Sequence, residues 1–314
     1  MRKGAAELRS ARLPAPAPGE ALVRTLFSGI SRGTERLVFE GAVGESEFKS
    51  MCCPMQEGGF PFPVKYGYCA TGVVEDGPPA LLGRNVFALH PHQDFFVAPA
   101  KALAPIPEQV PARRATLAAN METALNAVWD AGAGPGDRIV VVGCGIVGLL
   151  VASLATRLPG TAVTAVDTNP ARQTLASALG AAFATTDRAP ADADILFHNS
   201  ATGAGLNTAI KCAGIEGTIV EMSWYGGKPV QVELGGIFHS QRLKLVSSQV
   251  GMVSPGRRER WDPRRRLTSA LGLLDLPALD ALVAEEIAFE DAPKRLPHVF
   301  GAQGPAPVIR YPNT

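Results

Sequence analysis

The feature that most constrains this chain is a glycine-rich turn between an apolar strand and a helix. The segment RIVVVGCGIVGLLVASLA (138–155) places Gly143, Gly145 and Gly148 directly after a run of β-branched residues. The first glycine permits a tight turn, the second lets the backbone approach a pyrophosphate, and the third lets the helix pack closely on the strand. Such a turn opens the first βαβ unit of a dinucleotide-binding fold.

An acidic residue completes this fingerprint. Asp167 ends the next predicted strand, 19 residues after Gly148. At this spacing a carboxylate accepts hydrogen bonds from the adenosine ribose hydroxyls and repels a 2′-phosphate. Thr168 and Asn169 follow it, so no arginine is adjacent, although Arg172 is only five positions further on. The sequence therefore favours NAD(H) as the cofactor, with NADP(H) as the weaker alternative.

Strands and helical segments alternate through the middle of the chain at the cadence of βαβ units. The six predicted strands span residues 138–143, 162–167, 181–185, 193–199, 217–223 and 243–249. Six parallel strands make a full doubly wound sheet, which binds its ligand at the carboxyl edge. The cofactor-binding residues predicted from the turn and the later strand ends are Gly143, Gly145, Ile146, Val147, Gly148, Asp167, Thr168, Arg172, Ser200 and Ser223.

The chain before this region has a different texture. Residues 20–107 contain short β-type runs interrupted by Gly and Pro at close intervals, which is typical of an irregular, β-rich barrel. We therefore predict a catalytic or substrate domain made of residues 1–125 and 256–314, because the C-terminal tail is expected to return to it. Residues 126–255 are predicted to form the dinucleotide-binding domain.

The charge balance gives no reason to expect a nucleic-acid-binding or membrane-binding surface. Thirty Lys and Arg against 29 Asp and Glu leave a formal net charge of +1, too small a field to attract a polyanion. The arginines between residues 257 and 266 are interleaved with acids, so we interpret them as a solvated loop and helix start. The expected partner is a small-molecule substrate.

Location is also suggested by what the sequence lacks. Residues 1–20 have no apolar core of the kind a secretory signal needs. The longest apolar stretch, 139–155, is shorter than the roughly 20 residues that span a bilayer. The five cysteines form no CxxC pair, which suits reduced thiols. These observations predict a cytoplasmic protein.

Several segments together resemble the medium-chain dehydrogenase/reductase superfamily. PAPGEALVRTLFSGISRGTE (16–35) is similar to the family's opening, and FPVKYGYCATGVVEDG (62–77) is similar to its Gly-His-Glu segment. VVVGCGIVGLL (140–150) and DTNPARQTLASALGA (167–181) resemble its cofactor motif. The opening also resembles that of bacteriochlorophyllide hydroxyethyl dehydrogenases, and the general cadence is similar to threonine and sorbitol dehydrogenase-like members.

This resemblance implies an α/β fold in which a Rossmann doubly wound parallel sheet is joined to a GroES-like, β-rich catalytic domain. It also implies a homodimer in which the sixth strands, LKLVSSQ (243–249), pair across a two-fold axis.

The sequence departs from the family where zinc-dependent members bind their catalytic metal. Those members take ligands from a Gly-Ile-Cys motif and from Gly-His-Glu, and here Ser31, Tyr68 and Cys69 occupy the ligand positions. Zinc prefers thiolate, imidazole or carboxylate ligands, and neither hydroxyl ionises readily at neutral pH. The family's four-cysteine structural zinc lobe is missing as well. We therefore predict that the protein binds no zinc.

One alternative to this prediction is a metal site rebuilt elsewhere. Cys52, Cys53, His90 and His92 supply ligand types that zinc accepts. Adjacent cysteines rarely chelate one ion, however, and the two histidines alone supply two ligands. The opposing interpretation is that these residues are buried thiols in a loop and polar residues in a strand turn.

Without a metal, hydrogen-bond donors must stabilise charge on the acceptor oxygen of the substrate. The resemblance places Ser31, Thr34 and Tyr68 near the nicotinamide end of the site, and each hydroxyl can donate to a carbonyl or pass on a proton. We predict that these three are the catalytic residues, with Cys69 as a small packing residue. For Tyr68 the alternative is an aromatic plug that fills the position of the lost metal.

Several other polar residues have two possible roles each. Glu35 is interpreted as a structural partner of Arg32 or Arg36, with a catalytic role as the alternative. Glu122 lies on a predicted helix, where solvation and function are equally open. His198 and Asn199 end the fourth strand, and packing and function are open for them too. The predicted substrate-binding residues are Asn120, Trp224 and Tyr225.

The function predicted from these features is an NAD(H)-dependent, zinc-independent oxidoreductase that transfers hydride between nicotinamide and an alcohol/carbonyl substrate. One alternative is a reductase of an activated C=C bond, like quinone or enoyl reductases. Another is a non-catalytic NAD(H)-binding redox sensor that kept the fold after losing the metal.

Overall fold

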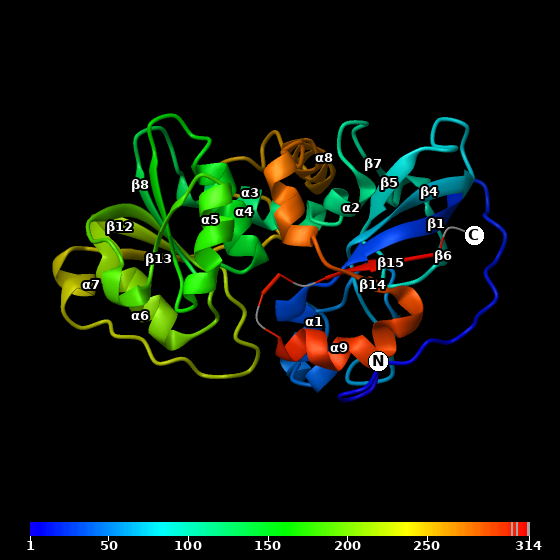
Figure 1. The fold of residues 1–314 in the computed structure, drawn as a ribbon, viewed down its shortest axis with the longest axis horizontal. Coiled ribbons are helices and arrows are strands. Elements are labelled where there is room, and N and C mark those ends of the chain that lie inside the picture. The colour runs from blue at the N-terminus through cyan, green and yellow to red at the C-terminus, as the bar shows by residue number, and fades with distance from the viewer. Residues whose placement is uncertain (303, 306, 313–314) are drawn as a thin grey trace. The chain divides into compact units, whose positions relative to one another are not determined.

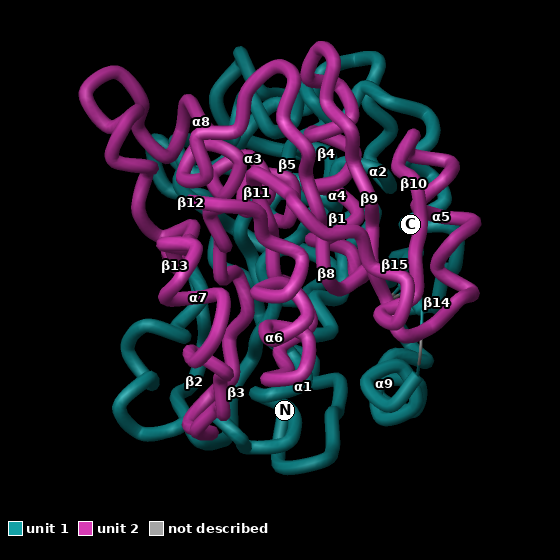
Figure 2. Tube along the Cα trace, turned by 90° about the vertical axis from the view of Figure 1, so that its left-hand side faces the viewer, with its two compact units in different colours: residues 1–119, 267–314 teal, residues 120–266 magenta. Residues whose placement is uncertain are grey.

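The computed structural model describes residues 1–302, 304–305 and 307–312. They form two compact units, shown in different colours in Figure 2: unit 1 contains both ends of the chain, residues 1–119 and 267–314, and unit 2 contains residues 120–266.

Unit 2 is built on a six-stranded parallel sheet. Its strands are β8 (Arg138–Val142), β9 (Ala162–Val166), β10 (Ala182–Ala184), β11 (Ala193–His198), β12 (Ala213–Glu221) and β13 (Lys244–Ser247). They lie in the order β10-β9-β8-β11-β12-β13 (Figure 1). This is the order of a doubly wound dinucleotide fold, whose topological switch point lies between β8 and β11. The Rossmann sheet predicted from the sequence is confirmed, and the six predicted strands agree with the observed ones to within a few residues at their ends.

The helices of unit 2 follow from the hydrophobic pattern. They are α4 (Ile146–Ala155), α5 (Gln173–Ala178), α6 (Gly203–Cys212), α7 (Ile237–Ser240) and most of α3 (Ala118–Ala131). Helix α4 is apolar on all sides, as a helix packed deep in an α/β core must be, and its residues 148–155 are all buried. Strand β8 beneath it has buried residues on both faces, as parallel strands covered by helices do.

Unit 1 contains a mainly antiparallel sheet of order β14-β15-β1-β4-β5-β7, with β6 also pairing with β1. The strands are β1 (Glu20–Gly29), β4 (Ala70–Asp76), β5 (Asn85–Ala88), β6 (Phe95–Pro99), β7 (Ala104–Pro105), β14 (Glu286–Ala288) and β15 (Val308–Arg310), with a separate pair, β2 (Glu57–Gly58) and β3 (Val64–Lys65). Its helices are α1 (Arg32–Glu40), α2 (Ala112–Ala115) and α9 (Ala292–Gly301), and α8 (Pro263–Leu273) begins at the end of unit 2. Because β15 pairs with β1, the C-terminal tail returns to the first part of the chain, as predicted.

One arginine of the 257–266 segment lies in the core of unit 2. Arg266 is only 2% exposed, and its guanidinium donates to Glu122 Oε1 at 3.0 Å and to Asn126 Oδ1 at 2.5 Å. It also donates to the backbone carbonyls of Val250 and Met252. The prediction of a solvated segment is therefore wrong for Arg266, and Glu122 is its buried partner. Burial raises the pKa of Glu122 while Arg266 opposes that rise.

No helix of the described residues is long and apolar enough to cross a membrane.

Candidate active site and dinucleotide-binding site

The glycine-rich turn of unit 2 has the shape of a cradle. Gly143 has φ 98°, and a Cβ there would lie 2.7 Å from Ser200 N, so only glycine fits. A Cβ at Gly148 would collide with the Gly143 carbonyl. A Cβ at Gly145, by contrast, would meet no heavy atom within 4 Å. The protein's own packing therefore requires the outer two glycines, while the middle one leaves exposed backbone that fits a pyrophosphate.

The first turn of α4 follows this cradle. Ile146 and Val147 are partly exposed at the start of the helix, where backbone N–H groups have no partner within the helix. The aligned peptide dipoles make this end of a helix favourable for a phosphate group. The turn and the helix start therefore fit the same anionic ligand.

Asp167 ties the cradle to the end of β9. Its Oδ2 accepts a hydrogen bond from Cys144 N at 2.7 Å and its Oδ1 accepts one from Asn169 N at 2.9 Å. Each carboxylate oxygen has a further lone pair, so the partly exposed side chain can still accept from a ribose hydroxyl. Burial and the neighbouring Asp167 raise the pKa of Cys144 to about 12, which keeps this thiol protonated.

Two residues carry buried polar atoms without a partner among the described residues: Arg172, which was predicted to bind the cofactor, and Asn199, whose role the sequence left open. Nε of Arg172 and Nδ2 of Asn199 both lack a hydrogen bond. Asn199 lies beside the cradle, because a Cβ at Gly143 would come within 2.8 Å of its carbonyl carbon. Unpaired buried donors are costly, so these two atoms suit a ligand that supplies acceptors. Thr168 is exposed.

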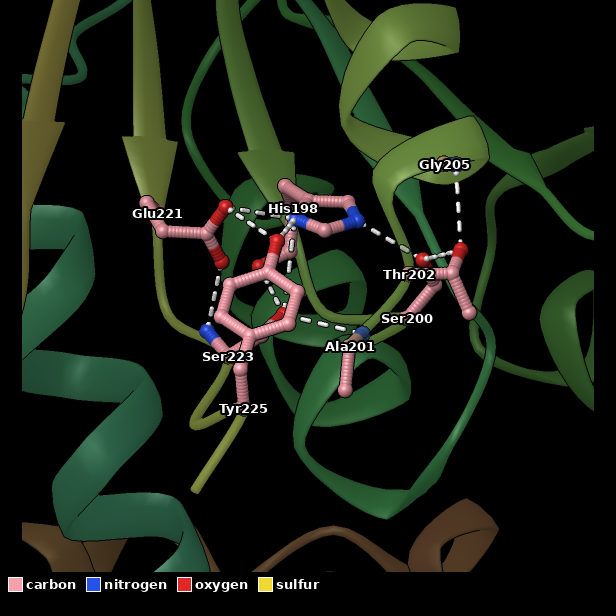
Figure 3. A network of polar contacts seen from close by, with 8 residues as sticks. All are labelled: His198, Ser200, Ala201, Thr202, Gly205, Glu221, Ser223 and Tyr225. Carbon is pink, nitrogen blue, oxygen red and sulfur yellow. Dashed lines mark hydrogen bonds and ion pairs between the residues drawn. The ribbon is translucent and has the colours of Figure 1, made fainter. Parts of the chain in front are cut away.

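A polar network joins the ends of β11 and β12 (Figure 3). His198 and Glu221 are partners in the parallel register, so their side chains are neighbours on one face of the sheet. His198 is fully buried, with Nδ1 2.8 Å from Glu221 Oε2 and Nε2 2.7 Å from Ser200 Oγ. Ser223 N donates to Glu221 Oε1 at 2.7 Å, and Tyr225 Oη donates to Oε2 at 3.0 Å.

The network brings together three residues that the sequence had singled out, namely Ser200, Ser223 and Tyr225. Sequence reasoning left the role of His198 open and missed Glu221, although both stand at strand ends where a doubly wound sheet places its ligands. Two other predicted site residues remain outside this network: Trp224 is 37% exposed, and Asn120 on α3 is 9% exposed.

In unit 1, the three predicted catalytic hydroxyls lie together. Tyr68 Oη donates to Ser31 Oγ at 2.5 Å and is also hydrogen-bonded to the Thr34 side chain. Strands β1 and β4 are paired so that Gly29 N donates to Cys69 O at 2.9 Å, and this pairing sets the loop after β1 beside the loop before β4. Burial, more than any neighbour, raises the pKa of Tyr68 above its ordinary value, so the phenol keeps its proton.

Glu35 is part of a second polar chain in unit 1. Its side chain is completely buried; Oε1 accepts from Ser31 N at 2.8 Å and Oε2 lies 2.9 Å from His92 Nε2. The predicted pairing with a local arginine is wrong. Arg32 instead donates to the Val299 carbonyl at 2.8 Å, and Arg36 lies 4.0 Å from Glu40.

His92, the histidine that contacts Glu35, is fixed by contacts on its other side as well. His92 Nδ1 is 2.7 Å from Ser28 Oγ, which in turn is 2.9 Å from Tyr311 Oη. Gly67, at φ 130°, lies against the ring, since a Cβ there would be 3.0 Å from His92 Nε2. The glycine before Tyr68 is thus required by close packing on His92, which the sequence had suggested only as a ligand of a rebuilt metal site.

The residues at the expected zinc positions do not fit that metal. Ser31 and Tyr68 are protonated hydroxyls bonded to each other, and Cys69 is a buried thiol whose pKa is raised well above its usual value by burial. Within the described part of the chain, no three His, Cys, Asp or Glu side chains are grouped to hold a metal.

The four residues considered for a rebuilt metal site have different surroundings and different partners. Cys52 is exposed, whereas burial raises the pKa of Cys53 to about 12. His90 stacks on Phe96 at 3.9 Å, and burial lowers its pKa to about 4. Its Nδ1 contacts the Pro91 carbonyl, and His92 is held by Glu35 and Ser28 as described above.

Comparison with known proteins agrees with this architecture, although no protein-family model matches the sequence. D-xylulose reductase A of Aspergillus niger is 26% identical over 250 residues, which cover 69% of each chain. A protein described as a zinc-binding dehydrogenase from Sinorhizobium meliloti 1021, solved with NADP, has TM-score 0.75 and 18% identity, covering 96% of this chain and 95% of its own. A short chain alcohol dehydrogenase from Escherichia coli CFT073, solved with NADH, has TM-score 0.76 and 17% identity, covering 99% and 96%.

The solved neighbours cover nearly all of this chain, whose β-rich unit is formed by both ends of the chain and whose second unit carries a Rossmann sheet. The sequence and the fold are therefore similar to those of alcohol and polyol dehydrogenases, in agreement with the resemblance to the medium-chain dehydrogenase/reductase superfamily. The resemblance and the fold class predicted from the sequence are both confirmed.

The buried Glu35–His92 pair gives a stability prediction. Replacing His92 by Leu leaves the Glu35 carboxylate buried with one fewer donor, which should cost on the order of 3–5 kcal/mol of unfolding free energy. Glu35→Gln keeps the shape and can still bond both partners, so it should cost about 1 kcal/mol. Urea denaturation measures both, with His239→Leu on the exposed surface as the control. Equal losses in the two core variants would contradict the assigned pairing.

Proposed function

We propose that this protein is an NAD(H)-dependent, zinc-independent oxidoreductase that transfers hydride between nicotinamide and an alcohol/carbonyl substrate. The observation that carries this proposal is the turn whose middle glycine faces open space between two glycines that packing requires. The name of D-xylulose reductase A supports alcohol/carbonyl chemistry on a small polyol or ketose. The formal net charge of +1 also suits a small-molecule substrate and offers no basic surface for nucleic acid.

NAD(H) is the preferred cofactor in this proposal. The Asp167 carboxylate lies at the end of β9, where it would accept from ribose hydroxyls and repel a 2′-phosphate. Solved neighbours of this fold were obtained with NADH and with NADP, so the fold itself accepts either. Arg172 is a cation that would favour NADP(H), and we take the Asp167 carboxylate as the stronger determinant because it directly follows β9.

The bound nicotinamide would supply or accept the hydride, and the chain's own residues handle the oxygen and its proton. Tyr68, Ser31 and Thr34 form a hydroxyl cluster in which the phenol stays protonated, so it can donate to a developing alkoxide. A donor replaces the metal in this scheme, which is consistent with the poor fit of these residues to zinc. Asn120, Trp224 and Tyr225 are proposed to contact the substrate.

Assembly and location complete the proposal. Strand β13 ends the six-stranded sheet, and Leu245 on it is 40% exposed, which leaves an edge suited to pairing with a second copy. We propose a homodimer formed through this edge, and a cytoplasmic enzyme.

Cofactor binding gives the first functional prediction. Gly145→Ala should leave the melting temperature unchanged, because its Cβ meets no protein atom and its φ of −74° is open to any residue. NADH affinity should nevertheless fall about tenfold or more, since the methyl group occupies the space of the pyrophosphate. Gly134→Ala, which also adds a Cβ into open space in unit 2, is the matched control. Fluorescence titration with an unchanged dissociation constant in Gly145→Ala would count against the site.

Catalysis gives the second. Tyr68→Phe removes one oxygen, so folding and NADH affinity should persist while reduction of a panel of ketoses and aldehydes slows about a hundredfold. Tyr66→Phe is the matched control, because that phenol lies 6.2 Å away, centroid to centroid, and donates only to the Met51 carbonyl. Unchanged turnover in Tyr68→Phe, together with a large loss in Tyr68→Ala, would make Tyr68 a packing residue.

A further inference from the structure

The hydrogen bonds at the ends of β11 and β12 have a defined donor-to-acceptor direction. Glu221 receives three groups: Ser223 N–H at Oε1, and Tyr225 Oη and His198 Nδ1 at Oε2. Burial alone would raise the pKa of this carboxyl, but hydrogen bonds from His198 and Ser223 lower it below its ordinary value. An ionised carboxylate only accepts hydrogen bonds, so His198 must carry its proton on Nδ1.

The direction continues to Ser200. In the tautomer that carries its single ring hydrogen on Nδ1, Nε2 has a lone pair 2.7 Å from Ser200 Oγ and accepts the serine hydrogen. Thr202 Oγ1 already accepts from Gly205 N at 3.0 Å, so its own hydrogen is available to Ser200 Oγ at 2.9 Å. Figure 3 shows the contacts that join Thr202, Ser200, His198 and Glu221. In this arrangement each hydrogen along these contacts points toward Glu221. Ser200 Oγ is left with a free lone pair and no free hydrogen.

Ser200 lies beside the dinucleotide cradle, on one particular side of it. Its backbone nitrogen is the nearest atom to a Cβ built on Gly143, at 2.7 Å. Strand β11, which leads to Ser200, pairs with β8 on the side opposite β9 and Asp167. A dinucleotide laid across the carboxyl edge with its adenosine ribose at Asp167 would extend its nicotinamide half toward Ser200.

We propose that Glu221 and His198 are positioning residues that hold Ser200 Oγ as a fixed hydrogen-bond acceptor for a donor on the nicotinamide half of the cofactor. The donor is a ribose hydroxyl or the carboxamide N–H2, both of which an acceptor oxygen recognises. This proposal rests on the dinucleotide-binding function proposed above. It adds that residues at the ends of β11 and β12 orient the Ser200 hydroxyl, besides packing in the sheet.

Glu221→Gln tests the proposal by reversing the direction of the network without removing an atom position. The amide can accept from Ser223 N and donate toward His198 Nδ1, so the ring proton should move to Nε2. His198 then donates to Ser200 Oγ and consumes its lone pair. The ¹⁵N shifts of labelled histidine should report Nδ1–H in the unmodified protein and Nε2–H in the variant, with His198→Asn identifying the resonance among the five histidines.

Binding is measured with NADH, ADP-ribose and ADP. NADH affinity should fall about tenfold in Glu221→Gln and in Ser200→Ala, and the double variant should lose no more than either single one. ADP affinity should stay unchanged, because ADP lacks the nicotinamide half. A parallel loss for ADP-ribose identifies the ribose hydroxyl as the donor, and a loss with NADH alone identifies the carboxamide. Glu216→Gln, exposed on the same strand, is the matched control.

Several outcomes would overturn the proposal. Equal NADH affinity in all variants, an unmoved histidine proton in Glu221→Gln, or a loss that extends to ADP would each do so. Labelling of Ser200 by a fluorophosphonate would also overturn it, because the Ser200–His198–Glu221 geometry would then activate a nucleophile. If the unmodified protein binds none of the three nucleotides, the proposed function itself fails. Binding that is insensitive to the variants removes only the positioning roles.

Discussion

The close backbone approach between the Gly143 turn and the end of β11 is the constraint on which the nucleotide site depends. Any side chain at Gly143 would collide with Ser200 N, so the turn and the loop after His198 must form together. The turn then opens α4 with exposed backbone, while Asp167 anchors its other side through Cys144 N. The polar network of β11 and β12 is added to this contact, which explains how residues distant in sequence converge on one edge of the sheet.

In unit 1, one strand pairing brings the predicted catalytic hydroxyls together. Pairing of β1 with β4 brings Ser31 and Tyr68 within 2.5 Å of each other. Glu35 and His92, which contact each other, stabilise this arrangement. Glu35 accepts a hydrogen bond from Ser31 N, and His92 packs on Gly67. Hydroxyls bonded in this way remain protonated, and a protonated donor can stabilise oxygen charge where relatives of this superfamily use a metal. In the proposed function, hydrogen-bond donation from these hydroxyls takes the place of Lewis-acid chemistry.

The sequence predicted what short-range patterns determine. The six strands, the glycine turn and Asp167 follow from βαβ cadence and fixed spacing, and the structure confirms the Rossmann sheet. Long-range polar pairing could not be predicted in the same way. Glu35 has arginines close in sequence yet pairs with His92, and Arg266 sits in a charged run yet lies in the core, because burial depends on strand register and helix packing. Glu221 lies 23 residues from His198, so its position at a strand end was a signal in the sequence but its pairing with His198 was not.

We propose that, during hydride transfer from the nicotinamide, hydroxyl donors and not zinc stabilise the charge on the substrate oxygen. The most direct measurement uses NADH deuterated at each face of C4 in turn, a mixed panel of ketones, ketoses and aldehydes, and protein dialysed against a chelator with its metal content measured. The account predicts that deuterium appears on the carbinol carbon of a product, from one face only, with no stoichiometric zinc present. Transfer that stops on chelation and returns on addition of zinc would contradict it, as would NADH binding with no transfer to any carbonyl.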